Sequence, residues 1–180
     1  NIDKKEYYFL NNLLGPKMLE NTKLESLLND PSLLAKKAYV AGEWVTAKNG
    51  KTFDVINPAT GEVIASLPDL DVKDAKHAID AAAVAQKKWA RHTGKERAAI
   101  LREMYNLMTL HADDLGVILT SEMGKPLAEG KGEIAYAASF FEWFGEEAKR
   151  IYGETIPGHM RDKRITVYLI PLLLLLVDRV

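Results

Sequence analysis

Apolar and polar residues alternate along two stretches in the first third of the chain. Residues 38–47 and 52–56 place hydrophobic side chains at about every second position, and Asn49-Gly50 lies between them. An Asn-Gly pair between two alternating runs is the strongest short-range signal of a β-hairpin. The pattern therefore predicts a β-hairpin across 38–56.

A turn and a third strand follow. In Asn57-Pro58-Ala59-Thr60-Gly61-Glu62, the proline fixes one backbone dihedral and the glycine supplies a positive φ. The apolar run Val63–Leu67 then predicts a further strand. Before the hairpin, leucines across 18–36 predict a short pair of helices packed on the body of the protein, with Asp30-Pro31-Ser32 as a stop and restart signal. A helix that binds a partner is the alternative interpretation.

Apolar residues then recur every three or four positions, as in amphipathic helices. Asp71 suits a helix N-cap, and the first helix runs to about Ala90. Its apolar face is mostly alanine, so we expect it to be sandwiched between other elements. Thr93 and Glu96 have the spacing of a capping box, which predicts a second helix to about His111. The expected core face of this second helix comprises Ile100, Leu101, Met104, Leu107, Met108 and Leu110.

A third helix at 112–123 and one long helix follow. Gly124 stands where a C-terminal cap needs a left-handed residue, and Pro126 stands where a new helix tolerates a missing N–H. The pattern predicts that the long helix continues to Ile151 and ends at Gly153. Its apolar face comprises Leu127, Ile134, Ala137, Ala138, Phe141, Phe144, Ala148 and Ile151.

The same long helix carries the densest groups of acidic and aromatic residues. The glutamates alternate with lysine and arginine at helical spacing, which favours a solvated face over an acid–base site. The aromatic residues are expected to be mostly core. Gly130-Lys131-Gly132 lies inside the helix pattern and fits neither a P-loop nor a dinucleotide fingerprint, so close helix packing is the better use of those glycines. The acidic residues are Glu129, Glu133, Glu142, Glu146 and Glu147, and the aromatic ones are Tyr136, Phe140, Phe141, Trp143 and Phe144.

Composition and charge narrow the functional classes. Hydrophobic residues at 47% and charged residues at 27% of the 180 are globular values. The net charge of −1 argues against a nucleic-acid partner. The sequence contains no cysteine, so this chain has no disulfide, thiolate metal ligand or catalytic thiol. Its four histidines are scattered without metal-ligand spacing, which favours surface or capping roles for His77, His92, His111 and His159.

The two ends of the chain are unusual. Residues 1–17 lack the features of a secretory or organelle signal, so we expect a cytoplasmic protein and interpret this segment as a tag-like extension before Met18. The apolar run 165–177 contains Pro171 and is shorter than the roughly 20 residues that a membrane span needs. We expect no membrane insertion, and either an exposed or a buried strand there.

Three sequence blocks resemble one family. GEWV at 42–45, INPATGEVIASLP at 56–68 and EMGKPLAEGKGEIAYAASFFEWFGEEAKRIYGETIPG at 122–158 are similar to the N-terminal region of aldehyde dehydrogenases, in particular succinate-semialdehyde dehydrogenases. The resemblance covers about residues 18–171. It implies an α/β parent fold, of which this chain is an α+β fragment with β-hairpin arms and four or five helices.

The resemblance also implies a division of the chain. Residues 18–158 correspond to the N-terminal part of an NAD(P)-binding domain and 159–171 to the start of an oligomerisation hairpin, whereas 172–180 form an apolar tail without family resemblance. The resemblance implies that the long helix lies along the mouth of the substrate tunnel, where Tyr136 and Phe140 would stand directly behind the residues that contact the aldehyde.

The family mechanism implied by the resemblance needs parts that this chain lacks. A cysteine thiolate attacks the aldehyde, hydride passes to NAD or NADP, and a glutamate activates water. All these residues map beyond 171, so we expect this chain to bind no cofactor and to be inactive alone. A module for self-association or pairing with full-length subunits, and a truncated product without function, are the alternatives.

Overall fold

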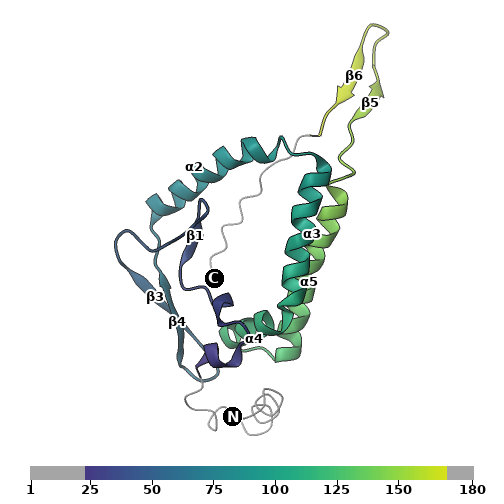
Figure 1. Cartoon of the computed structure of the whole chain (residues 1–180). Coiled ribbons are helices and arrows are strands. Elements are labelled where there is room, and N and C mark those ends of the chain that lie inside the picture. Colours follow the sequence, from purple (N-terminus) through teal and green to yellow (C-terminus); the bar gives the residue numbers. More distant parts are fainter. Residues whose placement is uncertain (1–22, 170–180) are drawn as a thin grey trace.

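The computed structural model describes residues 23–169 of the chain (Figure 1). Within this range, the elements follow one another as two 3₁₀ helices, four strands, four α-helices and two final strands. This mixture of helix and strand agrees with the expected α+β class. The predictions for residues 1–17 and for the apolar tail at 172–180 lie outside the described residues.

The N-terminal segment packs on the helical part of the protein, as expected. The predicted short pair of helices is present as two 3₁₀ helices, η2 at Leu24–Leu27 and η3 at Pro31–Leu33. Asp30 caps η3 by accepting the Ser32 backbone N–H. An apolar cluster forms where the segment meets the helices, and it comprises Leu28, Leu34 and Val117 with Leu24, Leu27, Ile118 and Leu127 at its edge.

The predicted β-hairpin across 38–56 is wrong. Strand β1 (Ala38–Val40) pairs with β2 (Glu43–Val45) through the two-residue turn Ala41-Gly42. Both turn residues have positive φ, 55° and 92°, as the tightest hairpin turns require. The second predicted strand is instead β3 (Thr52–Ile56), which pairs with a later strand.

Asn49-Gly50 therefore links two separate two-stranded sheets. The Gly50 N–H donates to the Ala47 carbonyl at 2.9 Å, and the Lys51 N–H donates to Asn49 Oδ1 at 2.8 Å. Local turn chemistry was predicted correctly at this pair. Its strand partners were not, because strand pairing depends on contacts that are distant in sequence.

The predicted third strand is present as β4 at Val63–Pro68, antiparallel to β3. The turn before it closes at Asn57, whose carbonyl accepts the Gly61 N–H at 2.8 Å and whose N–H donates to the Glu62 carbonyl at 2.9 Å. Gly61 has φ of 75°, the positive value expected at that position.

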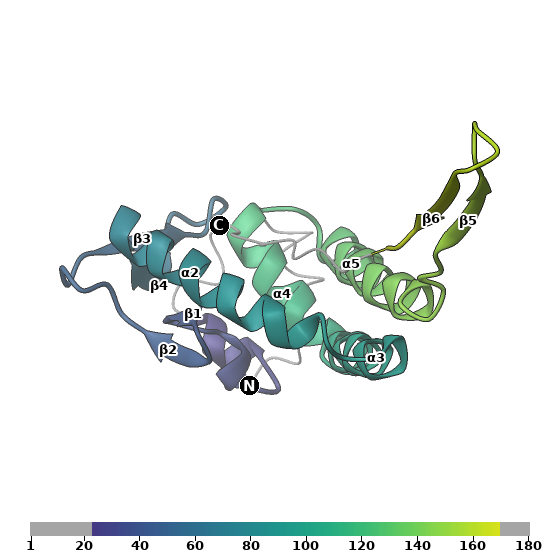
Figure 2. The ribbon, with the colours of Figure 1, turned by 90° about the horizontal axis from the view of Figure 1, so that it is seen from above.

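Helix α2 (Val72–Trp89) begins as predicted but is not sandwiched. The Asp71 carboxylate accepts the Lys73 and Asp74 N–H groups, and the Asp74 carboxylate accepts the Asp71 N–H. Figures 1 and 2 show α2 spanning the space between the small sheets and the other helices, and Asp74 is its one buried residue. The described part of the chain supplies no second layer over its alanine face.

Helices α3 (Gly94–Leu110), α4 (Ala112–Met123) and α5 (Leu127–Glu147) form the main packed unit. The Thr93 capping box starts α3 as predicted. Gly124 ends α4 with φ of 73° and donates its N–H to the Thr120 carbonyl. α5 lies antiparallel beside α3 (Figure 1), and α4 packs near their lower end.

Two predictions for these helices fail in detail. The α3 residues Ile100, Met104, Leu107 and Leu110 are exposed, because α5 covers only the side of α3 that carries Leu101 and Met108. The long helix ends at Glu147, short of Ile151. Its last turn tightens through bonds from Lys149 N–H to the Glu146 carbonyl and from Arg150 N–H to the Glu147 carbonyl.

The last two strands form a hairpin that projects away from the helices (Figures 1 and 2). Strand β5 (Glu154–Pro157) pairs antiparallel with β6 (Arg164–Val167), and Ile156 lies opposite Ile165. Every residue of β5 is exposed.

Among residues 23–169, none of the helices has both the length and the apolar character that a membrane span needs.

Candidate functional site on helix α5

Small residues on the inner face of α5 bring its backbone close to α3 and α4. Gly130, Ala138 and Gly145 are buried, spaced seven or eight residues apart along the helix. A Cβ on Gly130 would lie 2.6 Å from Thr120 Oγ1, and one on Gly145 would lie 3.5 Å from the Leu101 Cβ. Close packing was therefore predicted correctly for Gly130. It is wrong for Gly132, which faces open space.

The outer face of α5 carries an exposed row of aromatic side chains. The exposed fraction is 67% for Tyr136, 45% for Phe140, 65% for Trp143 and 56% for Phe144. The expectation that most of these side chains are core is wrong, since Phe141 alone among the five turns inward, and only partly. Gly130, Ala138 and Gly145 occupy the inner positions, so the large rings are left on the opposite side.

Tyr136 and Phe140, the residues expected near a substrate tunnel, lie together on this face. Their ring centroids are 4.9 Å apart and the rings are inclined by 73°, an edge-to-face contact. They are one helical turn apart, so the contact follows directly from i, i+4 spacing. These two residues with Trp143 and Phe144 are called the outer aromatic face, a row of exposed rings on one side of α5.

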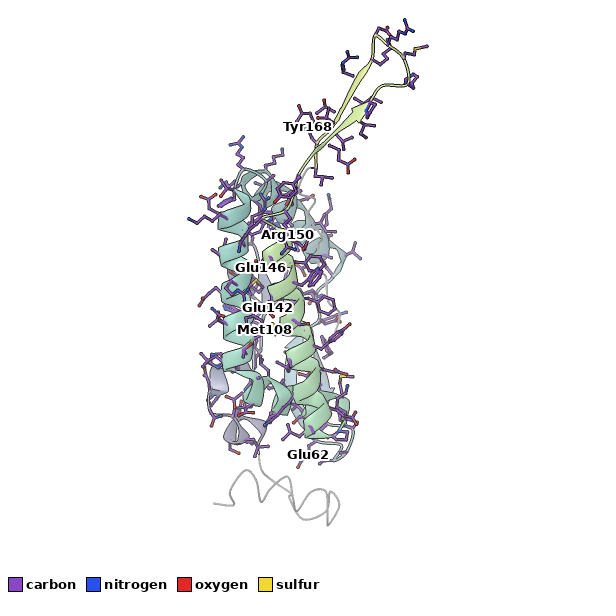
Figure 3. All side chains as sticks on the ribbon, turned by 90° about the vertical axis from the view of Figure 1, so that its right-hand side faces the viewer. Glu62, Met108, Glu142, Glu146, Arg150 and Tyr168 are labelled. Atoms are coloured by element: carbon purple, nitrogen blue, oxygen red, sulfur yellow. The ribbon has the colours of Figure 1, made fainter. Side chains whose placement is uncertain are left out.

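Ion pairs join α5 to α3 through Glu142 and Glu146, which are labelled in Figure 3. Arg102 of α3 donates from Nη1 to Glu142 at 2.9 Å and from Nη2 to Glu146 at 3.1 Å. Local ion pairs join Lys149 to Glu146 and Arg150 to Glu147, which agrees with the predicted charged face. The acidic series therefore forms ion pairs, as expected, but two of its members also join two helices.

These contacts shift the pKa of the charged groups. Hydrogen bonds from Lys149 and then Arg102 lower the pKa of Glu146. Hydrogen bonds to Glu142 and then Glu146 raise the pKa of Arg102. On α4, burial alone raises the pKa of Glu122. The ionised forms of Glu146 and Arg102 are thus stabilised by the fold, as in a structural ion-pair network.

Sequence reasoning missed the role of Asp114. This carboxylate is 4% exposed and accepts the Asn29 N–H at 2.9 Å, the Asn29 Nδ2 at 2.9 Å and the Asp30 N–H at 2.8 Å. Its position in the first turn of α4 was predicted, but its partners lie about 85 residues away in the sequence. No local signal marks such a pairing.

The histidines take the capping and surface roles that were expected. His111 joins α3 to α4, and the His92 ring nitrogen Nδ1 lies 3.0 Å from the Lys88 carbonyl. Within residues 23–169, no group of three or more His, Asp or Glu side chains is placed to hold a metal ion. The described side chains of α5 thus offer apolar contact and ion pairing.

Comparison with known proteins identifies the family. Residues 44–175 match the aldehyde dehydrogenase family over most of the chain. The chain belongs to the aldehyde dehydrogenase family. Similarity to individual aldehyde dehydrogenases is high and is confined to one part of them.

Three relatives illustrate this similarity. The chain is 58% identical over 140 residues to the glutarate-semialdehyde dehydrogenase of Pseudomonas aeruginosa, and 55% identical to the NADP(+) succinate-semialdehyde dehydrogenase of Escherichia coli. It is 50% identical to the 3-sulfolactaldehyde dehydrogenase of Pseudomonas putida. In each case the match covers 78% of this chain and 29% of the relative. The chain thus spans about 29% of the length of these aldehyde dehydrogenases.

Solved aldehyde dehydrogenase structures share the fold of this region. The aldehyde dehydrogenase from Brucella melitensis biovar abortus matches with a TM-score of 0.76 and 54% sequence identity. An Escherichia coli NADP-dependent enzyme matches with a TM-score of 0.76 and 55% sequence identity. Both matches cover 78% of this chain and 29% of the other. Betaine aldehyde dehydrogenase from Staphylococcus aureus, solved with NAD⁺, matches with a TM-score of 0.71 and 29% identity, over 78% and 28%.

Proposed function

We propose that this chain is the N-terminal part of a cytoplasmic, NAD(P)-dependent semialdehyde dehydrogenase that oxidises succinate semialdehyde to succinate. One observation carries the proposal, the 55–58% identity over 140 residues to semialdehyde dehydrogenases. The relatives' names share one substrate chemistry, a small aldehyde with an acidic group at its other end. Glutarate semialdehyde is therefore the competing substrate.

We further propose that the 180 residues alone bind no nicotinamide nucleotide and oxidise no aldehyde. The chemistry implied by the family resemblance needs a cysteine thiolate, and the chain contains no cysteine. The corresponding oxyanion donors and general-base glutamate also belong to the part of the relatives that this chain does not span. What these residues contribute is the packed unit of α3, α4 and α5.

A chimaera tests the parent function directly. The chain replaces the matching 29% of the Escherichia coli succinate-semialdehyde dehydrogenase, and turnover of succinate and glutarate semialdehyde is followed with NAD and with NADP. We expect an active chimaera with a preference for succinate semialdehyde. The matched control carries the same segment of the betaine aldehyde dehydrogenase, which is only 29% identical to this chain. A folded, inactive chimaera beside an active control would contradict the proposal.

The inactivity of the chain alone needs a separate assay. Purified 180-residue protein is incubated with both semialdehydes and both nucleotides, and reduced nicotinamide is measured by absorbance. The intact Escherichia coli enzyme is the positive control. Any turnover above the rate without protein would overturn this part of the proposal.

Tyr136 and Phe140 are proposed to lie directly behind the residues that contact the aldehyde in the complete enzyme. Support comes from their exposure on the outer aromatic face and from the resemblance of this helix to one at a substrate tunnel. In the chimaera, Phe140→Ala should raise KM for succinate semialdehyde about 3- to 10-fold with little change in kcat, which corresponds to about 0.6–1.4 kcal/mol of lost binding free energy. Val84→Ala, an exposed position on α2, is the control. Equal KM values for both variants would refute this placement.

A second candidate function is that of an assembly module. The β5–β6 hairpin projects from the helices, with backbone edges that the described residues leave unpaired.

If the hairpin pairs with full-length subunits, the tagged chain should co-purify with the co-expressed Escherichia coli enzyme, and Ile165→Lys should abolish the co-purification. Arg164→Lys preserves charge and is the control. If the chain does not co-purify with the enzyme, the assembly function is refuted. If the chimaera is inactive as well, the remaining interpretation is a truncated product without function.

A further inference from the structure

Asn49-Gly50 stands out chemically once its role as a hairpin turn is excluded. It is the one Asn-Gly pair in the sequence. Both residues are exposed, and a Cβ placed on Gly50 would have no atom within 4 Å. The turn is therefore open to solvent around Gly50.

Two hydrogen bonds of this turn bear on the reaction between the Asn49 side chain and the Gly50 N–H. The Lys51 N–H donates to Asn49 Oδ1 at 2.8 Å, which folds the side-chain amide back toward the main chain that follows it. The same bond polarises the amide carbonyl and stabilises negative charge that develops on Oδ1, as an oxyanion donor does. One contact opposes the reaction. The Gly50 N–H donates to the Ala47 carbonyl at 2.9 Å, and this hydrogen bond must break before the Gly50 nitrogen can attack.

We propose that Asn49 is a site of spontaneous deamidation to aspartate and isoaspartate. The Gly50 backbone nitrogen loses its proton to hydroxide and attacks Asn49 Cγ, forming a C–N bond. The Cγ–Nδ2 bond breaks, Nδ2 takes a proton from water and leaves as ammonia, the hydroxide is regenerated, and a cyclic succinimide remains. Water then opens either carbonyl of the ring, so that the main chain runs through the α-carboxyl in aspartate or through the side-chain carboxyl in isoaspartate. No oxidant or reductant is involved.

Other described asparagines lack this combination. The residue after Asn57 is Pro58, which has no N–H to lose. Asn106 lies inside α3, where the helical backbone engages the next N–H in the hydrogen-bond ladder. The N–H after Asn29 is that of Asp30, which donates to the buried Asp114 carboxylate.

The product would change the link between the two small sheets. A carboxylate at position 49 adds a negative charge beside Lys48, whose Nζ lies 3.9 Å from Asp74 in the α2 capping box. Isoaspartate also lengthens the backbone by one carbon, just before the Lys51 carbonyl accepts the Asp69 N–H. Both changes occur where β3, β4 and the start of α2 meet.

The experiment follows the intact 180-residue protein at mildly alkaline pH over days. Peptide mass spectrometry measures conversion at each asparagine, and a methyltransferase specific for isoaspartyl carboxylates, supplied with labelled S-adenosylmethionine, measures isoaspartate. We expect conversion at Asn49 at least about tenfold faster than at Asn106, a difference of about 1.4 kcal/mol in activation free energy. Conversion at both positions at the same rate would overturn the proposal.

A variant separates this site from the other asparagines. Asn49→Gln keeps an amide acceptor for the turn but must close a larger ring, so labelled methyl incorporation should fall to the level of the remaining asparagines. Undiminished labelling in Asn49→Gln would also overturn the proposal. The reaction needs no substrate or cofactor, so its outcome is independent of the dehydrogenase assignment.

Discussion

At the residue scale, Asp114 fastens the N-terminal segment to the helices. A buried carboxylate is unfavourable unless its oxygens are hydrogen-bonded. Two backbone N–H groups and one side-chain amide meet this requirement, and they come from Asn29 and Asp30 beside the Leu28–Leu34–Val117 cluster. Polar and apolar contacts thus hold the same junction.

Substitution of Asp114 tests this junction. Asp114→Ala should lower the free energy of unfolding by about 3 kcal/mol, because bonds to a charged acceptor are lost and buried donors remain unpaired. Asp114→Asn, which keeps one acceptor oxygen, should cost less. The neighbouring Asp113→Ala removes only an exposed pair with Lys131 and should cost less than about 1 kcal/mol. Urea unfolding measures all three, and similar losses for Asp113→Ala and Asp114→Ala would refute the assignment.

The helix caps make stability depend on pH. Backbone and hydroxyl hydrogen bonds from Thr93 lower the pKa of Glu96, and N–H groups of Asp74 and Lys73 lower that of Asp71. Groups with a lowered folded pKa stabilise the protein above their unfolded pKa, 4.5 for Glu and 3.8 for Asp. This stabilisation is lost as pH falls through the folded pKa. The raised pKa of Glu122 acts in the opposite direction.

We therefore expect the urea midpoint to fall as pH drops below about 4.5. The double variant Asp71→Asn, Glu96→Gln should be less stable than the parent at neutral pH and should lose less stability on acidification. Circular dichroism across a pH series measures both effects. Parallel pH curves for the parent and the variant would show that these caps do not cause the acid sensitivity.

At the element scale, two glycines on α5 have opposite roles. Gly130 faces α4, where an added Cβ would lie 3.0 Å from the Gly116 carbonyl, whereas Gly132 faces open space. Gly130→Ala should destabilise the protein by about 1–3 kcal/mol through overpacking. Gly132→Ala should stabilise it by about 0.5–1 kcal/mol, because alanine favours the helix. Thermal unfolding distinguishes them, and shifts of the same sign would contradict the packing described for α4 and α5.

The elements also show what could be predicted from sequence. Asp71, Thr93 and Gly124 cap their helices as predicted, because a cap depends on residues within about one turn. The hairpin at Asn49-Gly50 was predicted wrongly, since the partner of β3 lies beyond the following turn. Periodicity located α5 and most of its inner face, including Ala138, Phe141 and Ala148, but Phe144 of that predicted face and the other rings of the outer aromatic face were mistaken for core.

At the scale of the whole molecule, large side chains are exposed on several helices. None of the described large side chains is fully buried, and Ile79 and Val84 of α2 are at least half exposed, like most of the outer aromatic face. An exposed apolar surface of this kind marks a contact with another chain or segment. We expect the purified chain to self-associate as its concentration rises.

A double variant tests that expectation. Trp143→Lys with Phe144→Gln should weaken self-association about tenfold or more, while the free energy of unfolding should change by less than about 0.5 kcal/mol, as for surface substitutions. Ala138→Lys, on the buried inner face, should instead unfold the protein. Sedimentation velocity over a concentration series and urea unfolding provide the measurements. A double variant that unfolds would place these rings in a core.

The reach of the Asp114 contact has a kinetic consequence. The strand pairs and the α3–α4–α5 unit join segments that are neighbours in sequence, and such local structure forms quickly. The bonds from Asn29 to Asp114 instead close a loop of 85 residues. The chain loses more conformational entropy in closing this loop than in forming the local contacts. This closure should come after the folding transition state, so that loss of Asp114 accelerates unfolding and leaves the refolding rate almost unchanged.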